Sequence, residues 1–208
     1  MTKILLVRHG HVEGIHPERF RGRVELPLTE LGRQQAQLTA DKVARLWQPT
    51  AIYTSPLQRC IDTGAAIGQR TSAPCSVLAG LHDLDYGQWQ WKTFDEARGL
   101  DAHLFRLWFE APHLVRFPGG DALQDLVART ADALRMALAQ HTGQTVVFVG
   151  HDSVNRAMLL QALDQPLSAY WRVAQSPCAI NEFDVDGDGR ITVKRLNDTG
   201  HLDAKLSP

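Results

Sequence analysis

Apolar residues along the chain gather in short runs. The segments 4–7 and 145–149 are almost wholly aliphatic, which is typical of strands buried on both faces of a parallel sheet. The segment 51–54 is a third candidate strand, and Val77 and Leu78 predict a short fourth one. Each run is followed by polar or helix-like sequence, so the strands are predicted to alternate with helices.

Capping residues and apolar spacing predict the helices between these strands. Thr29 can begin a helix that ends near Trp47, because its hydroxyl accepts a hydrogen bond from an otherwise unpaired backbone N–H. Pro56 is expected at the first position of the next helix, where its missing N–H costs nothing. The longest pattern covers 121–140, and a last helix is predicted to end near Leu163.

The final third of the chain predicts a hairpin, since 180–185 and 191–196 are alternating runs joined by Asp186-Gly187-Asp188-Gly189. Together these patterns predict an α/β fold. It is a three-layer sandwich with a mostly parallel central sheet, helices on both faces and a C-terminal β-hairpin. We expect one domain over 1–208, with the aromatic-rich segment 89–118 as a small helical lid or insertion, whose rings mainly form a core.

Composition narrows the class of protein. Hydrophobic residues make up 44% and charged residues 22% of the chain, which is ordinary for a globular protein, and the net charge of −1 argues against a nucleic-acid binder. Cys60, Cys75 and Cys178 are too scattered for a disulfide framework or a zinc site. The first apolar run is too short for a signal peptide or a membrane span. We therefore expect a cytoplasmic protein that binds neither nucleic acid nor membrane; its oligomeric state stays open, a homodimer included.

Four residues suggest a site for a small dianion. His9 and His151 each follow an apolar strand, and ligands of open α/β sheets bind at the carboxyl ends of strands. Arg8 adjoins one histidine, and Arg59 lies in the first turns of a predicted helix. Since arginine matches phosphate oxygens with two parallel hydrogen bonds and keeps its charge, the four residues predict a phosphate pocket.

Several motifs in a fixed order strengthen this prediction. They are Arg8-His9-Gly10, Arg19-Phe20-Arg21-Gly22, Pro27-Leu28-Thr29-Glu30-Leu31-Gly32, Ser55-Pro56-Leu57-Gln58-Arg59-Cys60, Asp83-Leu84-Asp85-Tyr86-Gly87-Gln88-Trp89, Pro118-Gly119-Gly120-Asp121 and Gly150-His151-Asp152. The ordered set spans nearly the whole chain and resembles the histidine phosphatase superfamily, in particular its cofactor-dependent phosphoglycerate mutase-like branch.

The resemblance implies a metal-independent enzyme without a cofactor. His9 would attack phosphorus and form a phosphohistidine, while Arg8, Arg59 and His151 would hold the phosphate oxygens. Asp83 falls where the family has its proton donor. The expected activity is hydrolysis of a small phosphorylated metabolite; a phosphoglycerate mutase-type transferase and a non-catalytic phosphate-binding protein are the alternatives.

Two departures from the family pattern leave questions open. Many relatives have glutamate where Asp83 stands, so Asp85 and Asp152 compete for the role of proton donor, although Asp152 can also be read as a helix N-cap. Relatives also often have a phosphate-binding asparagine soon after the nucleophile, which this chain lacks. Its contact is either lost or replaced, and the substrate-proximal candidates are His11, Arg19, Arg21 and His82.

The acidic turn of the C-terminal hairpin resembles part of a calcium loop. Asp184, Asp186 and Asp188 have the spacing of the first ligands, but Arg195 stands where the loop needs a glutamate. The flanking sequence alternates like strands rather than helices. A plain acidic turn is therefore the preferred interpretation.

Overall fold

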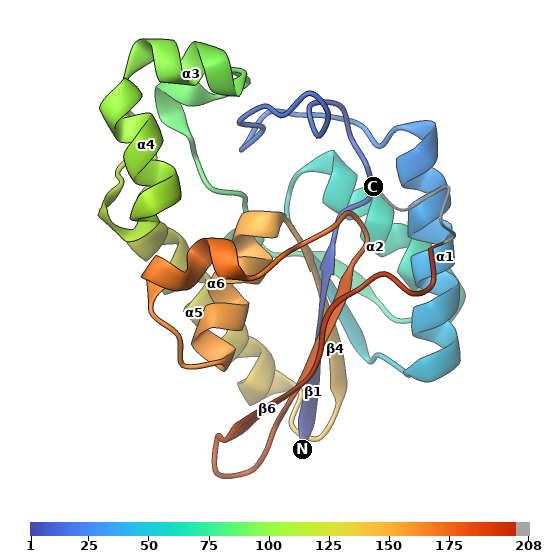
Figure 1. Cartoon of the computed structure of the whole chain (residues 1–208). Coiled ribbons are helices and arrows are strands. Elements are labelled where there is room, and N and C mark those ends of the chain that lie inside the picture. Colours follow the sequence, from blue (N-terminus) through green and yellow to red (C-terminus); the bar gives the residue numbers. More distant parts are fainter. Residues whose placement is uncertain (203–208) are drawn as a thin grey trace.

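A six-stranded sheet forms the centre of the molecule in the computed structural model, which describes residues 1–202 (Figure 1). The strand order is β3-β2-β4-β1-β5-β6. The first four strands of this order run parallel, whereas β5 and β6 are antiparallel to their neighbours. The strands are β1 (Thr2–Arg8), β2 (Ala51–Thr54), β3 (Cys75–Val77), β4 (Thr145–Gly150), β5 (Ile180–Val185) and β6 (Ile191–Asp198).

Helices cover both faces of this sheet. Figure 1 shows α1 and α2 on one side, with α5 and α6 on the other and α3 and α4 beyond them. The helices are α1 (Glu30–Leu46), α2 (Gln58–Thr71), α3 (Phe94–Leu100), α4 (Ala102–Glu110), α5 (Leu123–Gln140) and α6 (Asp152–Ala162). The predicted three-layer α/β fold with a C-terminal hairpin is confirmed. Within residues 1–202, no helix is both long enough and apolar enough to cross a membrane.

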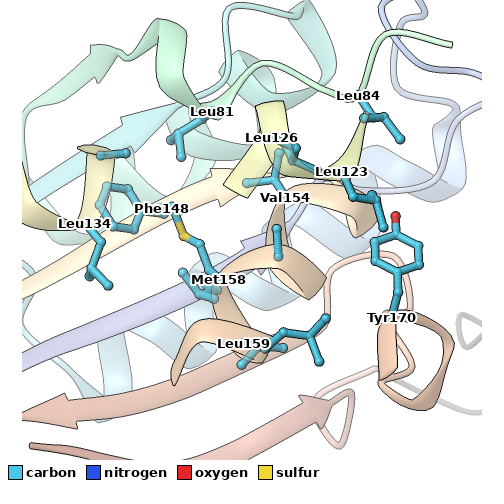
Figure 2. Close-up of a cluster of buried hydrophobic side chains, with 14 of the residues drawn as sticks. Leu81, Leu84, Leu123, Leu126, Leu134, Phe148, Val154, Met158, Leu159 and Tyr170 are labelled. Atoms are coloured by element: carbon cyan, nitrogen blue, oxygen red, sulfur yellow. The ribbon is translucent and has the colours of Figure 1, made fainter. Parts of the chain in front are cut away.

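The aliphatic strands explain why the sheet needs helices on both faces. Successive side chains of a strand point to opposite sides, so Ile4 and Leu6 of β1 belong to one core cluster and Leu5 and Val7 to the other. All four are fully buried. Figure 2 shows how α5 and α6 close the first cluster over Phe148 of β4, through side chains that include Leu126, Leu134 and Met158. The sheet is therefore held between two apolar layers.

The predicted start of one helix is wrong. Leu57 occupies the N-cap of α2 and the helix begins at Gln58, so Pro56 lies outside it. The N-cap predicted for α1 is confirmed, because Thr29 Oγ1 accepts a hydrogen bond from the backbone N–H of Gly32 at 3.1 Å.

The aromatic segment 89–118 packs largely into the main core. Trp89, Trp108 and Phe117 are each 1% exposed and belong to the cluster that also contains the sheet residue Phe148. Edge-to-face ring contacts join them at centroid distances of 5.4 Å (Trp89–Phe117) and 5.0 Å (Trp108–Phe117). The rings are therefore part of the core, as expected. The single domain and its lid stay predictions, and residues 203–208 of that domain lie outside the described part.

The acidic turn of the hairpin satisfies its own backbone. Asp186 Oδ1 accepts hydrogen bonds from the N–H groups of Asp188 and Arg190, both at 2.9 Å. Asp184 instead pairs with Lys3 at 2.7 Å. Strands β5 and β6 flank the turn, so the predicted hairpin is confirmed. A calcium loop of this type would have helices on both sides instead.

Candidate active site

Two histidines meet at the carboxyl edge of the sheet. Strands β1 and β4 are parallel neighbours in the register Arg8 with Gly150, so the residues that follow them, His9 and His151, leave the sheet side by side. The backbone N–H of His9 donates to the Gly150 carbonyl at 3.0 Å. The two imidazole rings lie 5.2 Å apart between centroids, at 64° to each other. The structure thus brings both predicted histidines into one site.

The hydrogen bond of the His9 ring fixes its tautomer. Nδ1 lies 2.7 Å from the carbonyl oxygen of Gly10, and a carbonyl can only accept, so Nδ1 carries the hydrogen. Burial, together with the charges of Arg59 and Arg8, holds the pKa of His9 well below its usual value. The ring is therefore neutral near pH 7, and its Nε2 presents a free electron pair.

Two buried guanidinium groups accompany this ring. Arg59 is fully buried and donates to the carbonyls of Val24 at 2.7 Å and Gly22 at 2.6 Å. Arg8, 5% exposed, donates to the carbonyl of Gln175 at 2.5 Å. In each guanidinium the buried Nε has no hydrogen-bond partner within the described residues. Unpaired buried donors cost free energy, so these two arginines are suited to holding an anion.

Asp83 stands beside His151 and Arg59. Its Oδ2 lies 3.4 Å from both His151 Nδ1 and an Arg59 terminal nitrogen, while Oδ1 accepts from the Ser153 hydroxyl and the Leu84 N–H. Burial raises the pKa of this carboxyl, which Arg59 only partly offsets. A carboxyl with a raised pKa can hold and release a proton at working pH. The other ring nitrogen of His151, Nε2, lies 2.8 Å from Ser55 Oγ.

The competing carboxylates have different surroundings. Asp85 pairs with Arg23 at 3.2 Å and accepts the Gly87 N–H at 2.8 Å, in a charge network away from His9. Asp152 is the first residue of α6, and His151 occupies the N-cap, so the N-cap interpretation of Asp152 is wrong by one residue. Burial opposes charge on Asp152, but Arg8, Arg156 and Arg21 outweigh this and lower its pKa.

A cavity of about 250 Å³ opens beside these groups. Arg8 and Asp83 line it, whereas His9, Arg59 and His151 lie buried next to them without lining it. The other ionisable residues of the lining are His16, Glu18, Arg19, Arg21, Asp152 and Arg156. An excess of arginine over carboxylate makes the cavity suited to a small anionic ligand.

Two of the four substrate-proximal candidates reach this cavity. Arg19 stacks on the Trp91 ring with its guanidinium 5.0 Å from the centroid, and Arg21 donates to the Gly14 carbonyl at 2.7 Å; both line the cavity. His11 and His82 do not line it. His11 Nδ1 lies 2.9 Å from Thr29 Oγ1, and His82 is half-buried.

Comparison with known proteins shows the family of the chain. Residues 4–199 match the family model described as the histidine phosphatase superfamily (branch 1). The chain belongs to this superfamily.

Phosphoserine phosphatase 1 of Hydrogenobacter thermophilus is 31% identical over 202 residues, which cover 97% of the chain and 95% of that protein. A bifunctional protein of Mycobacterium tuberculosis is 30% identical over 201 residues, and the chain spans only 55% of its length. The solved structure of Bacillus stearothermophilus YhfR superposes with a TM-score of 0.91 at 29% identity, covering 98% of the chain and all of YhfR.

The sequence patterns did not point to several residues of this cavity. Arg156 follows Asp152 by four positions, so the two share a helix face, and this spacing was a usable signal. Gln175 and Trp171 come from the stretch after α6, where no motif pointed to the site. Ser153, which donates to Asp83, was likewise unassigned.

Proposed function

We propose that the chain is a phosphomonoester hydrolase that transfers the phosphoryl group of a small phosphorylated metabolite to Nε2 of His9 and then to water. One observation carries the proposal. A neutral histidine, held by its Nδ1 hydrogen bond, stands with its free Nε2 beside two buried arginines whose Nε groups lack partners. This arrangement combines a nucleophile with binding groups for the phosphate oxygens.

In the first step, His9 Nε2 forms a bond to phosphorus as the bond to the leaving oxygen breaks. Arg8 and Arg59 offset charge on the three non-bridging oxygens. Burial and Arg59 lower the pKa of His151, so its neutral ring contributes a hydrogen bond rather than a charge. Asp83, whose raised pKa favours the acid form, gives its proton to the leaving oxygen. The products are an alcohol and phosphohistidine.

In the second step, the Asp83 carboxylate takes a proton from a water molecule as its oxygen attacks phosphorus. The P–N bond breaks, inorganic phosphate leaves, and His9 and Asp83 return to their initial states. The positive charge comes from the arginine side chains, so the proposed reaction needs no metal ion. A phosphoserine phosphatase 31% identical over nearly its whole length supports hydrolysis of a small metabolite. The three free thiols fit a cytoplasmic protein.

Purified protein with p-nitrophenyl phosphate and excess chelator tests the proposal. We expect turnover that persists in chelator and falls by more than about 10³-fold in His9→Ala. His103→Ala, an exposed histidine of α4, is the matched control and should keep full activity. Acid-labile, base-stable phosphate on the wild type, absent from His9→Ala, would support the intermediate.

Four outcomes would count against metal-independent hydrolysis through His9. Full activity in a folded His9→Ala protein would exclude the nucleophile, and loss of activity in chelator would exclude a metal-independent reaction. Conversion of 3-phosphoglycerate to its 2-phospho isomer, faster than phosphate release, would instead favour the mutase. No turnover combined with tight phosphate binding would favour the non-catalytic binding protein.

A further inference from the structure

The two carboxyl oxygens of Asp83 have different surroundings. Oδ1 accepts the Ser153 hydroxyl and, at 2.8 Å, the backbone N–H of Leu84. Oδ2 instead lies 3.4 Å from both His151 Nδ1 and a terminal nitrogen of Arg59. A carboxyl oxygen has two lone pairs, and both lone pairs of Oδ1 are engaged. The proton of the acid form therefore belongs on Oδ2.

Ser153 reaches this carboxyl from the interior of the protein. It is the second residue of α6 and fully buried, and it does not line the cavity, whereas Asp83 does. A buried hydroxyl needs a hydrogen-bond partner, and here the partner is a carboxyl 70 positions earlier in the sequence. The start of α6 also presents His151 at its N-cap. One helix start therefore positions both the second histidine of the site and the donor that holds the acid.

The other contacts of Asp83 hold its backbone rather than its carboxyl group. Asp83 lies in the stretch 82–86, which is neither helix nor strand. Its carbonyl accepts from Arg23 Nε at 3.2 Å and from a terminal nitrogen of Arg129 at 2.9 Å. The last side-chain torsion of aspartate is broad and nearly two-fold, so these bonds do not fix the carboxyl. Without the Ser153 hydroxyl, the inner oxygen would keep a free lone pair on which the proton could sit.

We infer that Ser153 is a positioning residue, whose hydroxyl keeps the proton of Asp83 on Oδ2, the oxygen that faces His151 and Arg59. This inference rests on the proposed hydrolysis at His9, in which Asp83 gives that proton to the leaving oxygen. In the second step the hydroxyl still occupies Oδ1, so Oδ2 takes the proton from water. Ser153 itself neither gains nor loses a proton.

The same hydrogen bond also makes Asp83 a stronger acid. Burial raises the pKa of Asp83, and the hydrogen bond from Ser153 is one of the contacts that oppose this rise. A donor to the carboxylate stabilises the charged form, so removal of the hydroxyl should raise the pKa further. Hydrolysis that needs the protonated acid is lost as pH rises through this pKa. In Ser153→Ala this loss should therefore occur at higher pH than in the wild type.

Two aryl phosphates of similar size separate proton donation from the rest of the reaction. The leaving oxygen of phenyl phosphate has a pKa of about 10, like that of tyrosine, and needs the proton. Nitrophenolate leaves p-nitrophenyl phosphate without one. Below the alkaline limb, Ser153→Ala should lower kcat/KM for phenyl phosphate about 10-fold, and that for p-nitrophenyl phosphate by less than about 3-fold. The limb for phenyl phosphate should move to higher pH.

A double variant tests whether Ser153 acts through Asp83. In an Asp83→Asn background, Ser153→Ala should cause no further loss of kcat/KM for phenyl phosphate, because the proton that Ser153 positions is already gone. Ser153→Thr keeps the hydroxyl and should retain the wild-type limb. If Ser153→Ala does not fold, Ser153→Cys, whose thiol is a weak donor, should show the same changes to a smaller extent.

Thr130→Val is the matched control. Thr130 of α5 is fully buried outside the cavity, and its hydroxyl donates to the Val127 carbonyl at 3.1 Å. Its replacement removes a buried hydroxyl in the same way as Ser153→Ala does. It should leave both the limb and the ratio of the two substrates unchanged.

Other results would overturn the inference while leaving the proposed function intact. Equal losses for both aryl phosphates in Ser153→Ala, with an unmoved limb, would show a purely structural role. Wild-type behaviour of Ser153→Ala would exclude any role, and losses that multiply in the double variant would show that Ser153 does not act through Asp83. Absence of turnover of both substrates by the wild type would instead contradict the proposed function.

Discussion

At the scale of single residues, the site combines groups whose surroundings push their protonation states apart. Burial and two arginines lower the pKa of His9, whereas burial raises the pKa of Asp83. The first shift favours the neutral form of the histidine, and the second favours the protonated form of the carboxyl. This pairing of a neutral nucleophile with a protonated acid is what the first step of the proposed reaction requires.

Replacing Asp83 should affect substrates according to their leaving groups. Asp83→Asn is expected to lower kcat/KM for an alkyl phosphate about 10²–10⁴-fold, because an alkoxide needs a proton to leave. p-Nitrophenyl phosphate should lose much less, since nitrophenolate is stable without one. In the wild type, alkyl phosphate hydrolysis should fall as pH rises through the raised pKa of Asp83, and Asp83→Asn should lack this limb.

Asp85→Asn is the matched control for that prediction. Asp85 pairs with Arg23 outside the cavity, so its replacement should keep the alkaline limb of the pH profile. If Asp85→Asn loses the limb and Asp83→Asn keeps it, the assignment of the proton donor is wrong.

Residue patterns predicted part of this site, for a physical reason. Arg8, His9 and His151 follow apolar strands, and adjacent parallel strands end at the same edge, so their proximity could be inferred. Arg156 and Gln175 contact the cavity from segments whose position depends on how α6 and the chain after it pack. Side-chain spacing alone does not fix that packing. The protonation states likewise depend on burial, which no single motif reveals.

At the scale of elements, two glycines let the backbone of the loop after β1 approach the start of α1 closely. A Cβ on Gly10 would lie 2.4 Å from the Gly32 carbonyl oxygen, and a Cβ on Gly32 would lie 2.1 Å from the His11 carbonyl oxygen. Both collisions are with backbone, which cannot move aside as a flexible side chain can. The close approach places the carbonyl of Gly10 where it fixes the His9 ring.

Gly10→Ala should therefore damage stability and activity together. We expect the free energy of unfolding to fall by about 1–3 kcal/mol, as for other overpacked sites. A shift of the His9 ring by about 1 Å should lower kcat roughly 10²-fold. Urea unfolding and phosphate release measure the two effects.

Gly99→Ala is the control, because nothing lies within 4 Å of its Cβ position in α3. It should stabilise the protein by about 0.5–1 kcal/mol, since alanine favours helix, and should not change activity. Equal effects of the two substitutions would contradict the role given to Gly10.

Element boundaries show where sequence patterns stop being informative. The apolar run 51–54 located β2 as the structure has it, and the alternating run 180–185 located β5. Strand β3 lies at the sheet edge with all three of its residues exposed, so it has no pattern of buried and exposed positions. Helix α2 has Leu57 at its N-cap, so no polar capping residue marks its start in the sequence. Pro56 predicted a start that is too early by two residues.

At the scale of the whole molecule, the end of β6 and the residues that follow it pack against α1. Lys42 of α1 pairs with Asp198 at 2.8 Å, and His201 Nε2 lies 2.9 Å from Thr39 Oγ1. Leu202 is 7% exposed within the cluster between α1 and the sheet. This packing closes the apolar layer on that face, so groups far from the proposed active site contribute to global stability.

His201 should make that stability depend on pH. Burial lowers its pKa to about 4 in the folded protein, against about 6.5 for a histidine in the unfolded chain. Between these values the unfolded chain binds a proton that the folded chain does not, so stability is lost as pH falls through this window. Between pH 7.5 and 5, allowing for the partial exposure of the ring, the loss of unfolding free energy from His201 is about 1 kcal/mol.

Urea unfolding at several pH values measures this effect. The free energy of unfolding of His201→Gln should decline less than that of the wild type as pH falls. That of the control His113→Gln should decline as the wild type does. A wild-type decline unchanged by His201→Gln would show that other groups, such as the buried His9 and His151, carry the whole effect.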